Sequence, residues 1–186
     1  SNIINFWVSP TNNLGANFSP IFINDNNISI QCKGYNASGQ LGLGHTTSPQ
    51  TAFSTLNTTT FHPNNVLNIW TFSSTASGFT VIQTTNNRIW FSGANTNGVF
   101  GNNSTTSSSS FVDVTSFWGN LFLPIQSLLG SMATSAFCII HRKNGTQDIL
   151  HISGILSTAA GNIPVNVSLS FLQPGETISQ LTFSGN

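Results

Sequence analysis

Charge is scarce in this sequence: only 4% of its 186 residues are Asp, Glu, Lys or Arg, against roughly 25% in an ordinary soluble domain. Four basic residues balance four acidic ones, so the formal net charge is zero. A protein that binds nucleic acid needs clustered basic side chains to neutralise phosphate groups. The composition therefore argues against nucleic acid as a partner, and against electrostatic attraction to an anionic membrane surface.

Long apolar runs are missing as well. None reaches the roughly 18 residues of a membrane-spanning segment, so we expect no membrane span. Ile, Val, Leu and Phe are spread regularly, and hydrophobic residues make up 38% of the chain, which favours a packed domain over a disordered coil. The first residue is Ser1 and not Met, from which we expect a processed chain or part of something longer.

Cysteine is nearly absent. Cys32 and Cys138 are the only two, too few for a disulfide framework and without the spacing of metal ligands. We therefore expect no metal site and no cofactor, and the redox state of the two thiols stays open. The polar residues are mostly Asn, Ser and Thr, a composition that we associate with extracellular fibres, virion surfaces and adhesins, because contacts between uncharged groups respond little to salt. An extracellular or virion-surface location is the expectation that follows.

The sequence does contain an internal repeat. Residues 34–42, GYNASGQLG, align with residues 93–101, GANTNGVFG, at one fixed offset. Each copy follows a short expected strand, at residues 28–33 and 88–92, and each of these strands follows an Asn-rich turn. Glycine at these positions favours tight turns with positive φ, where a β-carbon would be strained.

A third copy lies at a similar distance, about 60 residues on, which is a spacing typical of repeat proteins. Residues 137–141 and 148–153 are expected strands on either side of the turn at residues 143–146, whose Asn-Gly pair is a strong hairpin signal. One apolar segment precedes each hairpin and one strand-like segment follows it, which makes about four strands per unit, as in a propeller blade. These flanking segments are residues 3–9, 51–56, 66–73, 111–114, 125–130 and 163–167, with a further apolar segment at 178–184.

Residues 34–44, GYNASGQLGLG, resemble the repeat motif of the regulator of chromosome condensation (RCC1) family, which reads approximately G-x-N-x-x-G-Q-L-G-x-G. The second copy has Val99 and Phe100 in place of Gln and Leu, and the third, at residues 154–161, is nearly lost. In that family the resemblance implies a β-propeller of about seven blades, with the glycine motif as a tight turn that supports the blade core. The residues of this structural turn motif are Gly34, Asn36, Gly39, Gly42, Gly44, Gly93, Asn95, Gly98 and Gly101.

The predicted fold class is therefore all-β, with RCC1-like β-propeller blades in one region, residues 1–186. We place the units at about residues 3–62, 66–121 and 125–174, followed by the first strand of a further unit at 178–186. Propellers close with four or more blades, so the arrangement is open or partial. The missing blades could come from a longer polypeptide, which we favour, or from neighbouring chains, or the units could form an open arc.

Catalytic constellations are weak in this sequence. If residues 144 and 145 form a two-residue turn, Cys138 faces His151 and His141 faces Asp148 across the hairpin. A cysteine nucleophile also needs an orienting partner and an oxyanion hole, and none can be named. We therefore interpret the first pair as half-buried and the second as an exposed cross-strand pair.

Other functional sites are equally poorly supported. The glycine-rich turn is not followed by a helix or by the Lys-Ser or Lys-Thr pair of a phosphate-binding loop, and the four acidic residues fall in different units or turns, unlike a glycosidase pair. Trp7 and Trp70 occupy matching places in consecutive units, which predicts packing in the core. Trp118, in the loop at residues 117–120, is the candidate for surface contact. The acidic residues are Asp25, Asp113, Asp148 and Glu176.

The functional hypothesis is a non-enzymatic structural and protein-interaction module of an extracellular or virion-surface assembly, such as a fibre, capsid or filament. Its partners would be protein subunits of the same or a larger assembly. The alternative is an adhesin module that binds a host receptor or a glycan. The family resemblance implies a third interpretation, an exchange factor for a small GTPase that also binds chromatin, but such proteins use charged loops and this chain is almost uncharged.

Overall fold

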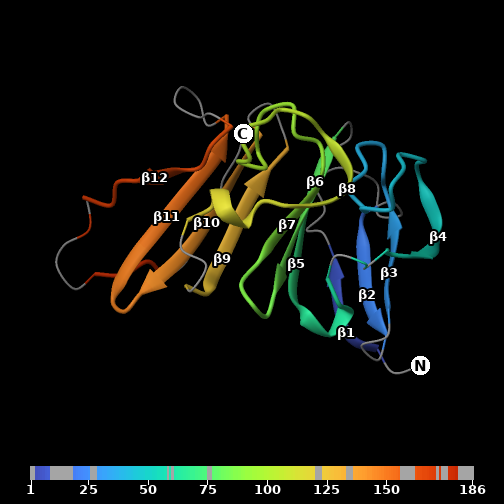
Figure 1. The fold of residues 1–186 in the computed structure, drawn as a ribbon, viewed down its shortest axis with the longest axis horizontal. Helices are drawn as coiled ribbons and strands as arrows, with labels where there is room; N and C mark the ends of the chain where they lie inside the picture. Colours follow the sequence, from blue (N-terminus) through green and yellow to red (C-terminus); the bar gives the residue numbers. More distant parts are fainter. Residues whose placement is uncertain are drawn as a thin grey trace.

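Over the residues that the structure describes, the fold is a row of three four-stranded antiparallel sheets, seen in a computed structural model (Figure 1). Strands follow one another in sequence order across each sheet, and we call the sheets blades 1, 2 and 3. The all-β prediction is confirmed, and so is the prediction of blade-like units. The structure describes residues 3–8, 19–25, 29–57, 59, 61–74, 77–119, 123–132, 136–155, 162–170, 172 and 176–179.

Each blade consists of a meander whose four strands are joined by turns and loops. Blade 1 contains β1 (Ile3–Val8), β2 (Ile21–Asp25), β3 (Ser29–Gly34) and β4 (Gln50–Thr55). Blade 2 contains β5 (Val66–Ser73), β6 (Gly78–Thr84), β7 (Ile89–Gly93) and β8 (Ser108–Asp113). Blade 3 contains β9 (Ile125–Ser131), β10 (Phe137–Asn144), β11 (Gln147–Gly154) and β12 (Val165–Val167). Two short 3-10 helices, η1 (Pro63–Asn65) and η2 (Thr115–Phe117), flank blade 2.

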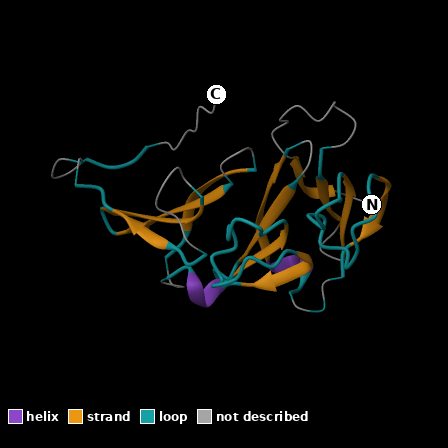
Figure 2. Ribbon diagram, turned by 90° about the horizontal axis from the view of Figure 1, so that it is seen from above, coloured by secondary structure: helices purple, strands orange, loops and turns teal. Residues whose placement is uncertain are grey.

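The blades stand in an open arc with blade 2 in the middle (Figures 1 and 2). The first strand of blade 2, β5, contacts the first strands of both other blades, β1 and β9. Equivalent strands therefore lie side by side, as they do around the axis of a propeller. The expected further strand at residues 178–186 is not seen at residues 178 and 179, which have no strand structure, and the rest of that prediction lies outside the described residues.

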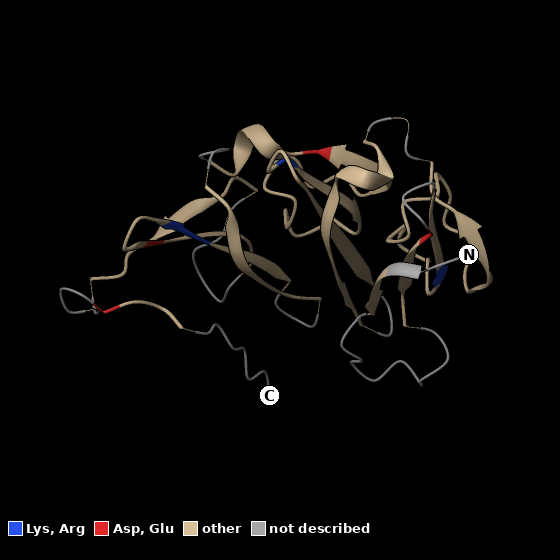
Figure 3. Ribbon diagram, turned by 90° about the horizontal axis from the view of Figure 1, so that it is seen from below, with Lys and Arg blue, Asp and Glu red and all other residues tan. Residues whose placement is uncertain are grey.

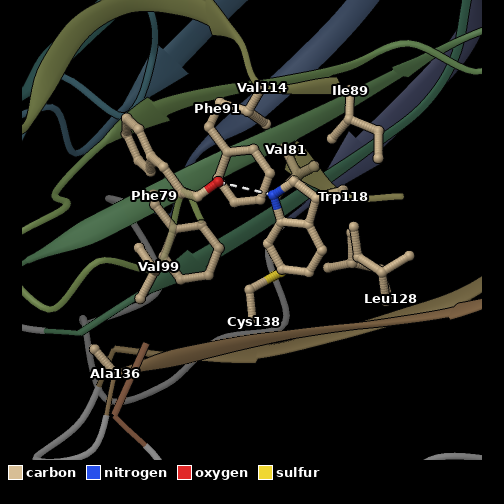
Figure 4. Packing of buried hydrophobic residues seen from close by; sticks show 12 residues of the cluster. Phe79, Val81, Ile89, Phe91, Val99, Val114, Trp118, Leu128, Ala136 and Cys138 are labelled. Carbon is tan, nitrogen blue, oxygen red and sulfur yellow. Dashed lines mark hydrogen bonds between the residues drawn. The ribbon is translucent and has the colours of Figure 1, made fainter. Parts of the chain in front are cut away.

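Two hydrophobic cores fill the spaces between the blades, because each sheet can shield its apolar faces only by packing on its neighbours. The core between blades 1 and 2 includes Phe22, Ile30, Ile69 and Ile82. The core between blades 2 and 3 is rich in aromatic rings, among them those of Phe79, Phe91, Phe100 and Trp118, which Figure 4 shows in part. Successive side chains of a strand point to opposite faces, so blade 2 contributes to both cores.

The hairpin of β10 and β11 differs from the predicted register. Asn144 pairs with Gln147 and Lys143 with Asp148, so the turn residues are Gly145 and Thr146. Gly145, with φ of 61°, is the first central residue of this turn, the position at which a type II′ hairpin turn has its glycine, and Asn144 does not take the positive φ that a type I′ Asn-Gly turn needs. Cys138 therefore lies opposite Ser153 and not opposite His151, and the predicted Cys-His pairing is wrong.

Candidate functional site

A fully buried asparagine organises the turn motif of blade 1. The Asn36 side-chain nitrogen donates hydrogen bonds to the carbonyl oxygens of His45 at 2.9 Å and Thr47 at 3.4 Å. Its side-chain oxygen accepts a hydrogen bond from the Leu41 N–H at 3.0 Å, and its own N–H donates to the Ser48 hydroxyl at 2.9 Å. One amide thus holds the glycine turn and the following loop, residues 43–49, in a single conformation.

The same arrangement recurs in blade 2. The Asn95 side-chain nitrogen donates to the carbonyl oxygens of Ser104 at 3.0 Å and Thr106 at 3.2 Å. Its side-chain oxygen accepts from the Phe100 N–H at 2.9 Å, and its own N–H donates to the Ser107 hydroxyl at 3.0 Å. Every partner matches its counterpart in blade 1. We call residues 43–49 and 102–107, which are mostly exposed, the Asn-clamped loops.

The glycines of the motif allow the turns to pack closely on the next blade. All seven of them have positive φ, and they are Gly34, Gly39, Gly42, Gly44, Gly93, Gly98 and Gly101. A β-carbon on Gly39 would lie 2.5 Å from the Ser109 Cα, and one on Gly98 would lie 2.7 Å from the Asn162 Cα. No side chain fits at these two positions, because the backbone of the following blade occupies the space.

Hydrogen bonds tie each turn to the following blade. The Ser92 hydroxyl of blade 2 donates to the Gly39 carbonyl oxygen of blade 1 at 2.5 Å, and the Ser153 hydroxyl of blade 3 donates to the Gly98 carbonyl oxygen of blade 2 at 2.7 Å. Sequence reasoning missed these serines. A signal was present, since Ser precedes the first glycine of the motif in both blades, as Phe-Ser-Gly and Ile-Ser-Gly.

Backbone contacts extend these ties to the clamped loops. The Gly44 N–H donates to the Ser109 carbonyl oxygen at 2.8 Å, and the Asn103 N–H donates to the Asn162 carbonyl oxygen at 2.7 Å. Both loops follow the third strand of their blade, so they lie at the same end of neighbouring sheets. Together they form a polar edge with a rigid backbone, which is the setting in which loops commonly carry binding sites.

The two Asn-clamped loops that form this edge contain no Asp, Glu, Lys or Arg. Figure 3 shows the few charged residues scattered over the three sheets and not gathered into one patch. A pocket beside the first loop, lined by Gly42, Leu43, Asn57 and Phe111 among others, has a volume of about 150 Å³. Sites for small molecules usually measure about 300 to 1,000 Å³, so this hollow is small for a metabolite. The edge suits hydrogen bonding to a surface better than enclosure of a small ligand.

Trp118 does not lie on the surface, and the prediction of a surface contact is wrong. It is fully buried between blades 2 and 3, where its indole N–H donates to the Phe100 carbonyl oxygen at 2.7 Å and its ring stacks on Phe91 (Figure 4). The Arg142 guanidinium of blade 3 donates to the Trp118 carbonyl oxygen at 2.8 Å. The short helix η2 turns the chain inward here, so the ring fills the space between two sheets. Trp7 and Trp70, by contrast, pack partly buried against the cores, as the repeat predicts.

The two thiols are poorly suited to nucleophilic chemistry. Burial raises the pKa of Cys32 to about 12 and raises the pKa of Cys138 well above its ordinary value. A thiol acts as a nucleophile in its ionised form. Burial of each thiol in its hydrophobic core disfavours that form. The pKa of His151 is lowered by burial and by the charge of Arg142.

His141 and Asp148 form a buried pair, so the prediction of an exposed pair is wrong. The His141 Nε2 atom lies 2.6 Å from an Asp148 carboxylate oxygen, and the Ser127 hydroxyl lies 3.3 Å from the other ring nitrogen. Burial would raise the pKa of Asp148, but hydrogen bonds from His141 and the Ile178 N–H, with the charges of Lys143 and His141, lower it overall. The Lys143 ammonium lies 3.8 Å from the same carboxylate.

The Ser127–His141 pair of this hydrogen-bonded group has a structural counterpart in blade 2. Asn68 and Gln83 pair across β5 and β6 at the same register, and the Asn68 side-chain nitrogen donates to the Gln83 side-chain oxygen at 3.3 Å. Ser127 and His141 are therefore one version of a cross-strand polar pair that the blades repeat. Asp25 and Asp113 do not join it, since Asp25 lies in blade 1 and Asp113 in blade 2.

In the part of the chain that the structure describes, no group of three or more His, Cys, Asp or Glu side chains is placed to hold a metal ion. None of the helices described in the structure is long and apolar enough to cross a membrane.

Comparison with solved structures identifies the fold. The chain resembles the crystal structure of human WBSCR16, with a TM-score of 0.57 and 12% identity over 81% of this chain and 36% of that one. It resembles yeast RCC1 (Prp20) bound to Kap60, with a TM-score of 0.58 and 12% identity over 88% and 40%. A structure of Prp20p from Saccharomyces cerevisiae, described with its binding properties to Gsp1p and histones, gives 0.58 and 13% over 88% and 41%.

No family model matches the chain, and no curated protein sequence matches it. The chain spans well under half the length of each of the three structures. At such low sequence identity, the likeness shows the fold alone, which does not give the function. The fold is that of RCC1-like β-propeller blades.

Proposed function

Because the chain has the blades of an RCC1-like β-propeller, we propose that it is a non-catalytic protein-interaction module whose Asn-clamped loops contact a protein partner. The observation that carries this proposal is the repetition of the clamp. Asn36 and Asn95 hold exposed polar loops in the same conformation on neighbouring blades, through matching hydrogen bonds. A loop that is already ordered loses little conformational entropy on binding, which favours affinity.

The chemistry of the partner follows from the loops. They present backbone amides, hydroxyls and the side chains of Asn and Thr, with the imidazole of His45 in the first loop. Neutral contacts of this kind suit a protein surface and lose little strength in salt. One yeast structure is a complex of RCC1 (Prp20) with Kap60, and the other is described with the binding properties of Prp20p to Gsp1p and histones, which supports protein binding as the class of function. A basic histone would find little charge on this chain, which has four acidic residues.

The finer part of the proposal is that the module is a structural subunit of an external assembly such as a fibre, capsid or filament. Its support is the composition, with 4% charged residues, and no comparison adds to it. The adhesin alternative loses its main residue, because the indole of Trp118 is buried and is not exposed to stack on a sugar.

The test places a photo-crosslinking amino acid at Thr46 and at Thr105, one in each clamped loop, and at Gln147 at the far hairpin as a control. The protein is then irradiated in its native assembly or host extract, and crosslinked peptides are sequenced. We expect crosslinks to one protein from both loops and none from Gln147. The purified pair should lose less than about threefold in affinity between about 0.05 and 0.5 M NaCl. Crosslinks to the control position alone, or affinity that collapses with salt, would overturn the proposal.

A further inference from the structure

Two Asn-Gly pairs occur in the sequence, Asn97-Gly98 and Asn144-Gly145, and the structure gives them opposite surroundings. Asn144 and Gly145 lie at the tip of the β10–β11 hairpin, at the end of the blades opposite the Asn-clamped loops (Figure 1). Both residues are exposed, and a β-carbon on Gly145 would meet no atom within 4 Å. The space around this pair is therefore open.

The hydrogen bonding of the hairpin tip is equally sparse. Among the described residues, none accepts a hydrogen bond from the Gly145 N–H. Asn144 is the last residue of β10, and its pair with Gln147 is the last of the ladder. The end of a ladder opens at little cost in free energy. The Gly145 nitrogen and the Asn144 side chain can therefore meet while the rest of blade 3 stays folded.

The Asn97-Gly98 pair, by contrast, is held in place. The Gly98 N–H donates to the Asn95 carbonyl oxygen at 2.8 Å, and the Gly98 carbonyl oxygen accepts the hydrogen bond from Ser153. Gly98 is buried, and a β-carbon on it would lie 2.7 Å from the Asn162 Cα. The nitrogen of Gly98 is therefore occupied, and movement of this turn requires that blades 2 and 3 separate locally.

From this contrast we propose that Asn144 is a site of spontaneous deamidation, a covalent modification that Asn97 resists in the folded chain. The backbone nitrogen of Gly145 attacks the side-chain carbonyl carbon of Asn144. A C–N bond forms, and the side-chain nitrogen takes up the proton of the Gly145 N–H and leaves as ammonia. Water then adds to either carbonyl carbon of the five-membered imide and opens the ring, which gives aspartate or isoaspartate. Glycine favours the attack because it has no side chain to hinder it.

Deamidation changes both the charge and the main chain of the hairpin. The formal net charge of the sequence is zero, and each event adds one negative charge. In the isoaspartate product the main chain runs through the former side chain and is one methylene longer, so the pair with Gln147 loses its register. The neighbouring pair is Lys143 and Asp148, whose buried carboxylate also binds His141. The Asn-clamped loops lie at the other end of the blades, so this proposal and the protein-interaction proposal stand or fall independently.

The experiment compares the two asparagines in one sample. The folded 186-residue chain is incubated in mildly alkaline buffer, peptides that contain each asparagine are followed by mass spectrometry, and isoaspartate is detected by enzymatic methylation. We expect Asn144 to deamidate at least about tenfold faster than Asn97, because the folded state raises the barrier at Asn97. In urea both should react at similar rates, since glycine follows each of them and the packing is lost. Equal rates at the two asparagines in the folded chain would overturn the proposal.

Two variants separate the chemistry from the fold, and near-ultraviolet circular dichroism checks that each is folded. Gly145→Ala places a methyl group beside the attacking nitrogen, where the structure leaves room for it, and should slow deamidation of Asn144 at least about tenfold without an effect at Asn97. Ser153→Ala removes a hydrogen bond that holds Gly98 and should speed deamidation of Asn97 alone. An unchanged rate at Asn144 in folded Gly145→Ala would overturn the attack by the Gly145 nitrogen. Equal acceleration of both asparagines in Ser153→Ala would show that local structure does not set the two rates, which also overturns the proposal.

Discussion

The Ser153 hydroxyl donates a hydrogen bond to the Gly98 carbonyl oxygen, 2.7 Å away and 55 residues earlier in the chain. Both groups are buried between blades 2 and 3, and Ser92 and Gly39 form the same bond between blades 1 and 2. Adjacent blades are thus joined by a specific polar contact in addition to their apolar cores. Such a contact favours one docking register over others, because a shifted register would leave a buried carbonyl oxygen without a donor.

Replacing Ser153 should measure this contact. We expect Ser153→Ala to lower the free energy of unfolding by about 1 to 3 kcal/mol, because the Gly98 carbonyl oxygen is left buried and unpaired. Urea denaturation followed by tryptophan fluorescence gives the value. Thr105→Ala, at an exposed loop position, should change it by less than about 0.5 kcal/mol. Equal effects of the two substitutions would show that the hydroxyl contributes nothing.

The close approach at Gly39 gives a second prediction. Gly39 has φ of 81°, and a β-carbon there would lie 2.5 Å from the Ser109 Cα. Gly145 has a similar φ of 61°, but a β-carbon there would meet no atom within 4 Å. We expect Gly145→Ala to cost about 1 to 2 kcal/mol from the left-handed backbone alone, and Gly39→Ala to cost clearly more because blade 2 must also move. Thermal unfolding of both variants tests this, and similar melting temperatures would contradict it.

The clamp can be tested with an isosteric change. Asn95→Asp keeps the oxygen that accepts from the Phe100 N–H but aims a carboxylate at the carbonyl oxygens of Ser104 and Thr106. Burial and the facing oxygens should keep the new carboxyl protonated, so the variant should lose stability as the pH rises above about 4. We expect a loss of at least about 2 kcal/mol at pH 7 and faster proteolysis of residues 102–107. Asn97→Asp, at a half-exposed position, is the control and should show neither effect.

The pH dependence of the free energy of unfolding should reveal how much the ionised Asp148 carboxylate stabilises the native chain. Burial opposes ionisation of this carboxyl, but hydrogen bonds from His141 and the Ile178 N–H, with the charge of Lys143, lower its pKa. A carboxyl with a lowered folded-state pKa stabilises the fold above its unfolded value of about 3.9, and this contribution disappears as the pH falls through the folded-state pKa. Asp148→Asn should therefore be less stable than wild type at pH 7, with a difference that shrinks below about pH 4.

Urea denaturation at a series of pH values measures that difference. Asp113→Asn is a suitable comparison, because Asp113 pairs with an Arg88 side chain that is half exposed, and exposed ion pairs contribute about 0 to 1 kcal/mol. Its effect at pH 7 should be the smaller of the two. A stability difference for Asp148→Asn that stays constant from neutral pH down to about pH 3 would show that the charge of Asp148 is not what stabilises the pair.

Much of the fold is readable from local sequence. The spacing of residues 34–42 and 93–101 predicts repeated units, and glycine at positions such as Gly39 predicts turns, because positive φ is a property of a single residue. Alternating apolar residues predict strands by the same local logic. The resemblance to RCC1 repeats rests on those turn positions, and the blade architecture follows from it.

Other features depend on how the sheets meet. Trp118 lies in a loop directly after the short helix η2, and only the space between blades 2 and 3 explains its burial. The register of β10 and β11 depends on where Gly145 turns the chain, and a shift of this kind changes which side chains face one another. The pairing of Ser153 with Gly98 joins residues that local patterns cannot connect. Local conformational preference is a property of neighbouring residues, whereas burial and long-range hydrogen bonds exist only once separate sheets have packed.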